Sequence, residues 1–146
     1  LVQYVNPAIS SIIELGITPV QHEAVLVNPR YGYAGTTDMV FTDADGNKGI
    51  LDYKSKKTKP GEKIFKSPEH KMQIAAYWLC AWEAAFDGMF PPNAIGYNMY
   101  ISTTEPGRVD VVKHERDDLA AAWDGFKACL ALYRYVKGYD ARVKSL

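Results

Sequence analysis

The stretch GYAGTTDMVFTDADGNKGILDYKSKK, residues 32–57, decides the fold that this chain is expected to adopt. The turn signal DADGN divides it into two apolar segments, 34–42 and 48–54, whose branched and aromatic side chains are typical of strands. Asp52 and Lys54 are two residues apart in the second segment, so both face the same side of the sheet. The stretch therefore predicts a β-hairpin with charged side chains in the middle of its apolar strands.

The segments on either side of this hairpin add helices and further strands. The predicted elements are, in order, a helix that begins at Asn6-Pro7 and ends before Gly16, strands at 20–28, 34–42 and 48–54, a helix from Glu69 to Phe86, strands at 94–103 and 108–114, and a helix from about Asp117 to Lys137. The order αβββαββα predicts an α/β fold in which helices flank a central mixed β-sheet. A length of 146 residues is that of a single domain, 1–146, and a chain that starts at Leu1 without a methionine is expected of a domain truncated at its N-terminus.

The charge of the chain is balanced overall but unevenly distributed. Lys+Arg and Asp+Glu both number 17, yet seven lysines and only two glutamates lie between Lys54 and Lys71. A basic segment on a neutral body is typical of a protein that contacts nucleic acid through one face.

The sequence also excludes several classes of protein. Cys80 and Cys129 occur in apolar helical patterns and are expected to be buried free thiols. Two thiols cannot hold a four-thiolate iron–sulfur cluster or a structural zinc site. No apolar run reaches membrane-spanning length and no signal peptide is evident, so we expect a soluble cytoplasmic protein with no membrane partner. His114, on the last strand, is expected at the surface.

Asp38 lies in the first strand of the hairpin, and its position relative to Asp52 depends on register. A five-residue loop, 43–47, sets Asp38 opposite Asp52. A four-residue loop sets it opposite Leu51 and requires a bulge to bring the carboxylates together. We expect the first arrangement or its bulged equivalent, with both aspartates on one face of the sheet.

Two carboxylates and an ammonium group are costly to gather unless a metal ion and an anionic substrate offset the repulsion and the desolvation. Such a set suits hydrolysis of a phosphodiester in DNA by a metal-bound water, with one or two Mg²⁺ or Mn²⁺ ions held by Asp38 and Asp52. Lys54 would orient the water or neutralise the phosphate, and the backbone carbonyl of Tyr53 is a further candidate ligand. The alternative is that these are solvated charges on a strand, although apolar residues flank each aspartate.

Three motifs in order, GTTDMVF, ILDYK and QIAAY, resemble those of the PD-(D/E)XK nuclease superfamily in its RecB-like exonuclease branch. The resemblance is to phage and prophage RecB-like exonucleases and to the mitochondrial genome maintenance exonuclease, and it spans roughly Glu23 to Tyr77. It implies a restriction-endonuclease-like core. It also implies a Mg²⁺- or Mn²⁺-dependent deoxyribonuclease, most simply an exonuclease that processes DNA in recombination, replication or repair.

Carried over residue by residue, the resemblance implies that Asp38 and Asp52 hold the metal and that Lys54 is the catalytic lysine. Gln73 and Tyr77 match the family motif Q-x-x-x-Y, whose members position the lysine, the water or the DNA backbone. Their spacing of four puts both on one face of the helix. On physical grounds alone, without the family resemblance, the alternative is that Tyr77 is simply a core side chain and Gln73 an amide on the helix surface.

Glu23 matches the acidic residue that many members carry on the first strand, as an additional metal or water contact. The neighbouring His22 could point inward instead. Many RecB-like members have a histidine on an upstream helix, and no histidine precedes His22 in this chain. Either the upstream part is missing or Glu23 takes that role, and the iron–sulfur subgroup is excluded by the cysteine count.

The segment that follows the catalytic strand is expected to contact DNA phosphates. The residues assigned to these contacts are Ser55, Lys56, Lys57, Lys59, Lys63, Lys66 and His70. A solvated lysine-rich loop is the alternative, and His70 can equally face solvent.

The expected partner is DNA, single-stranded or double-stranded with an end, in a bacterial or phage-infected host cell. A homo-oligomer and a recombination or replication protein are further candidate partners. A structure-specific endonuclease with the same site and a catalytically idle DNA-binding module remain as alternatives.

Overall fold

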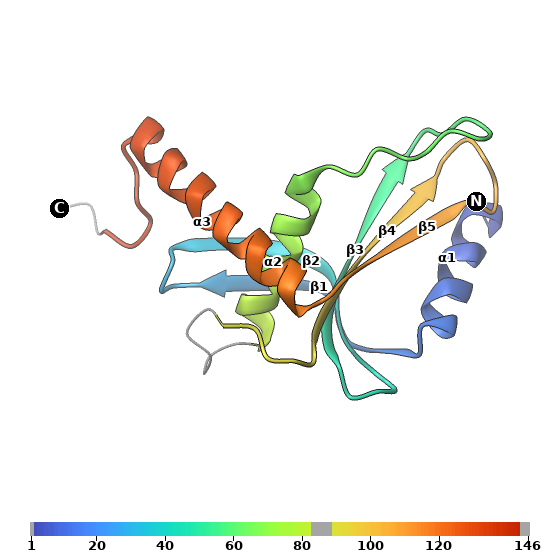
Figure 1. The fold of residues 1–146 in the computed structure, drawn as a ribbon, viewed down its shortest axis with the longest axis horizontal. Helices are drawn as coiled ribbons and strands as arrows, with labels where there is room; N and C mark the ends of the chain where they lie inside the picture. The colour runs from blue at the N-terminus through green and yellow to red at the C-terminus, as the bar shows by residue number, and fades with distance from the viewer. Residues whose placement is uncertain (1, 83–88, 144–146) are drawn as a thin grey trace.

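The computed structural model describes residues 2–82 and 89–143, which form a twisted five-stranded sheet with helices on both faces (Figure 1). The elements are α1 (Val2–Glu14), β1 (Ile17–Asn28), β2 (Tyr33–Asp43), β3 (Lys48–Lys56), α2 (Pro68–Trp82), β4 (Ala94–Ser102), β5 (Val109–His114) and α3 (Arg116–Lys137). This is the predicted order αβββαββα, and the predicted α/β fold with a mixed central sheet is confirmed.

The strands follow one another across the sheet in the order β1-β2-β3-β4-β5. Strands β3 and β4 are parallel because α2 connects them as a crossover, and the other neighbouring pairs are antiparallel. The central strand β3 therefore has an antiparallel neighbour on one side and a parallel neighbour on the other.

Each face of the sheet carries its own hydrophobic core. Helices α2 and α3 cover one face, where Ile50 of β3 packs with Trp78 of α2 and Trp123 of α3. Helix α1 covers the other face, where Ala8 packs with Leu51 of β3 and with residues of β2 and β4. Ile50 and Leu51 are adjacent on β3 and lie in different cores, so successive side chains of this strand alternate between the two faces of the sheet.

Two tryptophans of α2 fix this helix against the start of β3. The indole N–H of Trp78 donates to the carbonyl of Lys48 at 2.8 Å, and that of Trp82 donates to the carbonyl of Gly49 at 3.1 Å. Buried indoles need such acceptors. These two hydrogen bonds fix the rotation of α2 about its own axis relative to the sheet, and this rotation decides which of its side chains face the strands.

Three differences from the sequence-based expectations have physical causes. Helix α1 begins at Val2 rather than at Asn6-Pro7, so Pro7 lies inside it. The additional first turn lets Tyr4 and Val5 line an apolar hollow with β3 and β4, and this packing offsets the missing proline N–H. Cys129 is exposed rather than buried, because the buried residues of α3 (Leu119, Ala122 and Trp123) all precede it in the N-terminal part of the helix. His114 is buried rather than at the surface, because α3 covers the strand that ends with it.

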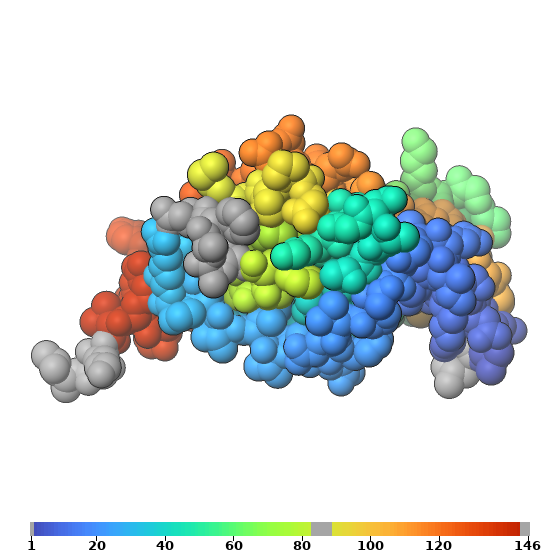
Figure 2. Space-filling view, turned by 90° about the horizontal axis from the view of Figure 1, so that it is seen from below, coloured from blue at the N-terminus to red at the C-terminus, as the bar shows by residue number. Residues whose placement is uncertain are grey.

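The predicted end of the second helix at Phe86 lies outside the described residues. Over the parts of the chain that the structure describes, no helix is long and apolar enough to cross a membrane. In the space-filling view of Figure 2, the green segment that follows β3 protrudes at the end of the molecule that also carries α1, and the red end of α3 forms the opposite end.

Candidate active site and metal centre

The register between β2 and β3 brings the two aspartates together. Met39 pairs with Leu51 and Thr42 with Lys48, so five residues form the loop and Asp38 comes one position beyond the last pair, opposite Asp52. The predicted five-residue loop and register are confirmed. The alternative pairing of Asp38 with Leu51 is excluded.

Strands β2 and β3 separate at Asp38. The ladder between them stops at Leu51, whereas β3 stays paired with β4 as far as Lys56. The backbone N–H of Tyr53 donates instead to Oδ2 of Asp38, at 2.7 Å. The aspartate side chain therefore takes the place of a ladder carbonyl, and its carboxylate is fixed at the point where the sheet opens.

Asp38 and Asp52 form what we call the acidic pair. Burial and the hydrogen bond shared with Asp52 raise the pKa of Asp38 to about 6, against the opposing effect of the Tyr53 N–H. Two carboxylates this close repel each other once both are ionised. A hard divalent cation, which prefers carboxylate oxygens, would relieve that repulsion, so the residues present fit such an ion.

Lys54 lies beside the acidic pair, on the same face of β3 as Asp52. Its ammonium is 2.7 Å from Oδ2 of Asp52 and donates to Oε1 of Gln73 at 2.9 Å. Gln73 comes from α2, so the contact joins the helix to the strand. An ammonium has three N–H donors, and these two partners fix the direction of the third.

Tyr77 reaches the same place from one turn further along α2. Burial, followed by the negative charges of Asp52 and Asp38, raises the pKa of its hydroxyl. The ring lies over Gly35 of β2, where an added Cβ would come within 2.7 Å of Cε1. The sequence reasoning did not assign Gly35 to the site, although its place three residues before Asp38 was a usable signal.

Glu23 has a different setting from the acidic pair. His22 pairs with Met39 and Ala24 with Thr37, so Glu23 on β1 lies opposite Asp38 on β2. Glu23 nevertheless has an exposed side chain. Its φ of 47° is in the left-handed region that a non-glycine residue rarely adopts. Among the described residues no three His, Cys, Asp or Glu side chains form a potential metal-binding group, so Glu23 does not join the pair in this arrangement.

The connection between β3 and α2, residues 57–67, is called the lysine loop here. Lys57, Lys59 and Lys63 are exposed on it, and Phe65 is 75% exposed. Lys66 is also exposed and lies 3.9 Å from Asp110. The loop therefore offers several ammonium groups next to the strand that carries Asp52 and Lys54, as the sequence predicted.

Of two further residues assigned to DNA contact, Ser55 lies elsewhere, whereas His70 is close enough to Lys54 and Asp52 for their charges to affect its pKa. Ser55 lines the apolar hollow under α1 with Tyr53, on the face of the sheet opposite Asp52. His70 is half-buried, and its Nδ1 lies 2.8 Å from the hydroxyl of Tyr100. Burial, and then the charges of Lys54 and Lys56, lower the pKa of His70. A lowered pKa favours the neutral imidazole at neutral pH.

The lysine loop is held by the turn between β4 and β5. The N–H of Thr58 donates to Oγ1 of Thr104 at 2.9 Å, and that hydroxyl donates back to the Thr58 carbonyl at 2.6 Å. The guanidinium of Arg108 donates to the carbonyls of Lys59, at 3.1 Å, and Glu62. These contacts, which sequence reasoning did not find, give the loop a defined position.

A comparison with models of protein families identifies the family of this chain. The family model described as the PD-(D/E)XK nuclease superfamily matches residues 8–141. The chain belongs to this superfamily. The nucleases of this superfamily generally use divalent metal ions.

Two further comparisons add little to the family assignment of this chain. No curated protein matches its sequence. Among solved structures it is similar to one titled "Crystal structure of SSO0001", with 18% identity and a TM-score of 0.45 over 95% of this chain. The chain spans 60% of the length of that protein.

Proposed function

We propose that this chain is a Mg²⁺- or Mn²⁺-dependent exonuclease that hydrolyses phosphodiester bonds from the ends of DNA. The observation that carries the proposal is the Asp38–Asp52–Lys54–Gln73 cluster, which joins three strand residues to α2 at the point where β2 and β3 separate. Membership of the nuclease superfamily supports the same chemistry.

The acidic pair would hold the ion, with the backbone carbonyl of Tyr53 as a further oxygen ligand and Glu23 as a more distant candidate. A divalent cation bound there lowers the pKa of a water molecule and offsets negative charge on the phosphate. The Tyr53 N–H keeps the Asp38 carboxylate facing Asp52, so the two ligands need little rearrangement to bind.

Lys54 would act on the water or on a phosphate oxygen. Asp52 and Gln73 occupy two of its three N–H groups, so the third is free to hold a water at the right angle or to neutralise developing charge on the phosphate. Gln73 is then a positioning residue, because it acts through the ammonium of Lys54. Tyr77, beside both aspartates, would direct its hydroxyl toward the DNA backbone.

The lysine loop would contact the DNA through phosphates, with Lys56 at the end of β3 and Lys57, Lys59, Lys63 and Lys66 on the loop. Such contacts are independent of sequence and weaken as salt rises. The resemblance to phage and prophage RecB-like exonucleases supports a place in recombination, replication or repair, in the cytoplasm of a bacterial or phage-infected cell. A homo-oligomer or a replication or recombination protein would be its assembly partner.

The test is cleavage of end-labelled DNA in Mg²⁺ or Mn²⁺, with linear and circular substrates in parallel. We expect cleavage of linear DNA only, and Lys54→Ala should abolish it while circular dichroism and melting stay as in the parent chain. Lys48→Ala, an exposed lysine at the other end of β3, is the matched control and should cleave normally.

The same experiment separates the alternatives. Cleavage of circular DNA would replace the exonuclease by a structure-specific endonuclease. Binding without cleavage in either metal would make the chain an idle DNA-binding module. Full activity in Lys54→Ala would contradict the proposed role of the lysine.

A further inference from the structure

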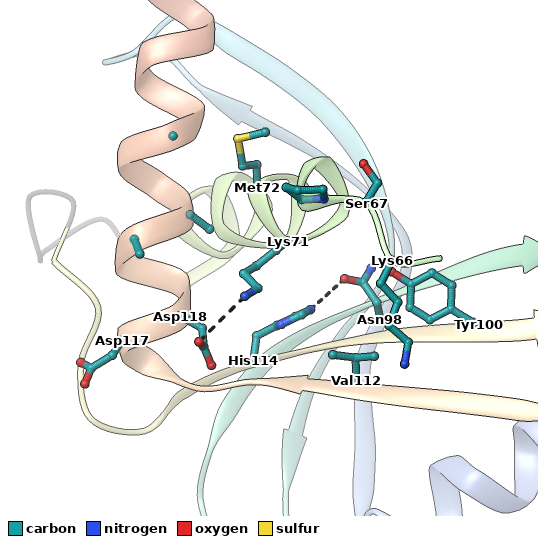
Figure 3. A pocket seen from close by; sticks show the side chains of 14 residues that line it. Lys66, Ser67, Lys71, Met72, Asn98, Tyr100, Val112, His114, Asp117 and Asp118 are labelled. Atoms are coloured by element: carbon teal, nitrogen blue, oxygen red, sulfur yellow. Dashed lines mark hydrogen bonds and ion pairs between the residues drawn. The ribbon is translucent and has the colours of Figure 1, made fainter. Parts of the chain in front are cut away.

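A hollow of about 610 Å³ lies between the first turns of α2 and α3, over β4 and β5 (Figure 3). Its lining includes Lys71, Met72, Asn98, Val112, His114 and Ala121. Neither member of the acidic pair lines it, so it is distinct from the proposed metal site. Its volume is in the range of pockets that hold small organic molecules.

Asn98 lies in this hollow with part of its hydrogen-bonding capacity unused. The residue is fully buried, and its Oδ1 is 2.8 Å from Nε2 of His114. Its Nδ2 has no hydrogen-bond partner within the described part of the chain. A buried amide donor without an acceptor is costly, so a ligand that displaces the side chains over Asn98 and brings an acceptor to its Nδ2 would be stabilised there.

The charges around the hollow cancel one another. Lys71 of α2 lies 3.9 Å from Asp118 of α3, across the hollow in Figure 3. Lys66 and Asp117 add one further charge of each sign to the lining. A free phosphate would meet as many carboxylates as ammonium groups, so the balance favours a neutral ligand over an anion.

The walls between these charges are apolar. Met72 of α2, Val112 of β5 and Ala121 of α3 present only hydrocarbon or sulfur to the hollow. A neutral ligand with apolar faces and a hydrogen-bond acceptor on its edge matches both the walls and Asn98. A nucleobase has this combination.

The hollow also adjoins the site on the sheet. Asn98 is the β4 partner of Asp52 on β3, and neighbouring strands lie roughly 4.8 Å apart. We propose that the hollow is a base pocket that receives one base of the DNA strand, next to the cleaved phosphate, with the amide of Asn98 donating to an acceptor on the base edge. The proposal rests on the proposed function, since it needs DNA at the acidic pair.

The test measures binding of fluorescent single-stranded oligonucleotides in EDTA, so that no cleavage occurs. An abasic residue is moved through successive positions of the oligonucleotide. At one position it should weaken binding to the parent chain about tenfold, the scale of one well-held base. Ala121→Leu, which fills the hollow from an exposed helical position, should bind the intact oligonucleotide as weakly as the abasic one.

Ala128→Leu is the matched control, since Ala128 is exposed on the same side of α3 two turns further along and does not line the hollow. It should discriminate the abasic position as the parent does. Melting temperatures of both variants verify that they fold.

Each other outcome overturns the proposal. Equal binding of intact and abasic oligonucleotides at all positions, or discrimination that survives in Ala121→Leu, excludes a base in the hollow. A third outcome assigns the hollow to a free nucleoside instead. In that case thymidine stabilises the parent chain but not Ala121→Leu, and the parent binds intact and abasic oligonucleotides equally. Failure to bind any oligonucleotide overturns the pocket alone, because EDTA removes the ion that the proposed function needs, and that function is tested separately by cleavage in Mg²⁺ or Mn²⁺.

Discussion

Gly35 offers a direct test of how α2 and β2 build the site. An ideal Cβ at this position would lie 2.7 Å from Cε1 of Tyr77 and 3.3 Å from its hydroxyl oxygen. Non-bonded carbons need about 3.5 to 4.0 Å, so in Gly35→Ala the ring must move by about 1 Å. The ring would then leave its position beside the acidic pair.

Overpacking of this size costs roughly 1–3 kcal/mol. We expect about 1–2 kcal/mol here, because the contact is with the far end of a half-buried side chain that rotates about two bonds. For a chain of this length the loss corresponds to a melting temperature lower by about 3–6 °C. Urea unfolding followed by tryptophan fluorescence gives the free energy, and cleavage of linear DNA should fall in the same variant.

A double-mutant cycle with Tyr77→Leu isolates the contact. Once the ring is gone, Gly35→Ala should cost nearly nothing, so the coupling free energy should be about 1–2 kcal/mol. Thr36→Ala, at the exposed neighbouring position, is the control and should change stability by less than about 0.5 kcal/mol. An equal cost of Gly35→Ala with and without the Tyr77 ring would refute the reasoning.

Three other predictions concern His114, Asp38 and Glu23. Burial lowers the pKa of His114 from 6.5 to about 4, so between these pH values the unfolded chain binds one proton more than the folded chain. The free energy of unfolding should therefore be highest above pH 6.5 and fall by up to about 3 kcal/mol as the pH drops to 4. Urea titrations at several pH values should show this slope in the parent chain and not in His114→Gln. Because burial and Asp52 raise the pKa of Asp38, Asp38→Asn should stabilise the chain in EDTA at pH 7 by about 1 kcal/mol, a value discounted for solvent screening. Mg²⁺ should raise the melting temperature of the parent chain but not that of Asp38→Asn. An Asp38→Asn variant less stable than the parent in EDTA would contradict the repulsion between the two aspartates. Glu23→Gly should raise the free energy of unfolding by about 0.5–1 kcal/mol, because Glu23 has a positive φ that glycine adopts without strain. Glu23→Gln tests a different point: a higher Mg²⁺ concentration needed for cleavage would identify Glu23 as a metal ligand, and an unchanged concentration would exclude it.

The sequence predicted those features that depend on local pattern. The hairpin register followed from the length of one loop, and the shared face of Asp52 and Lys54 followed from strand alternation. The contact of Gln73 with Lys54 came from family resemblance, since helix periodicity alone left Gln73 as a surface amide.

Features that depend on how distant elements meet could not be predicted in this way. The burial of His114 requires α3 to cross the last strand, and the fit of Gly35 to Tyr77 requires the rotation of α2 that its tryptophans set. The backbone of Glu23 adopts a conformation that residue type disfavours, so propensity predicts against it. Asn98 lies in a strand whose residues are almost all buried, and nothing in its sequence marks it as the residue with an unpaired donor.

The contacts of Thr58 and Arg108 with the lysine loop have a consequence for the entropy of DNA binding. A flexible lysine-rich loop would lose conformational freedom when it settles on a phosphate backbone, and that loss would weaken the complex. Here the loop is ordered by a turn 46 residues later in the chain, before any DNA is present. The loss is incurred during folding, when the sheet assembles, so in the proposed complex each lysine would meet its phosphate with only its own side chain left to order.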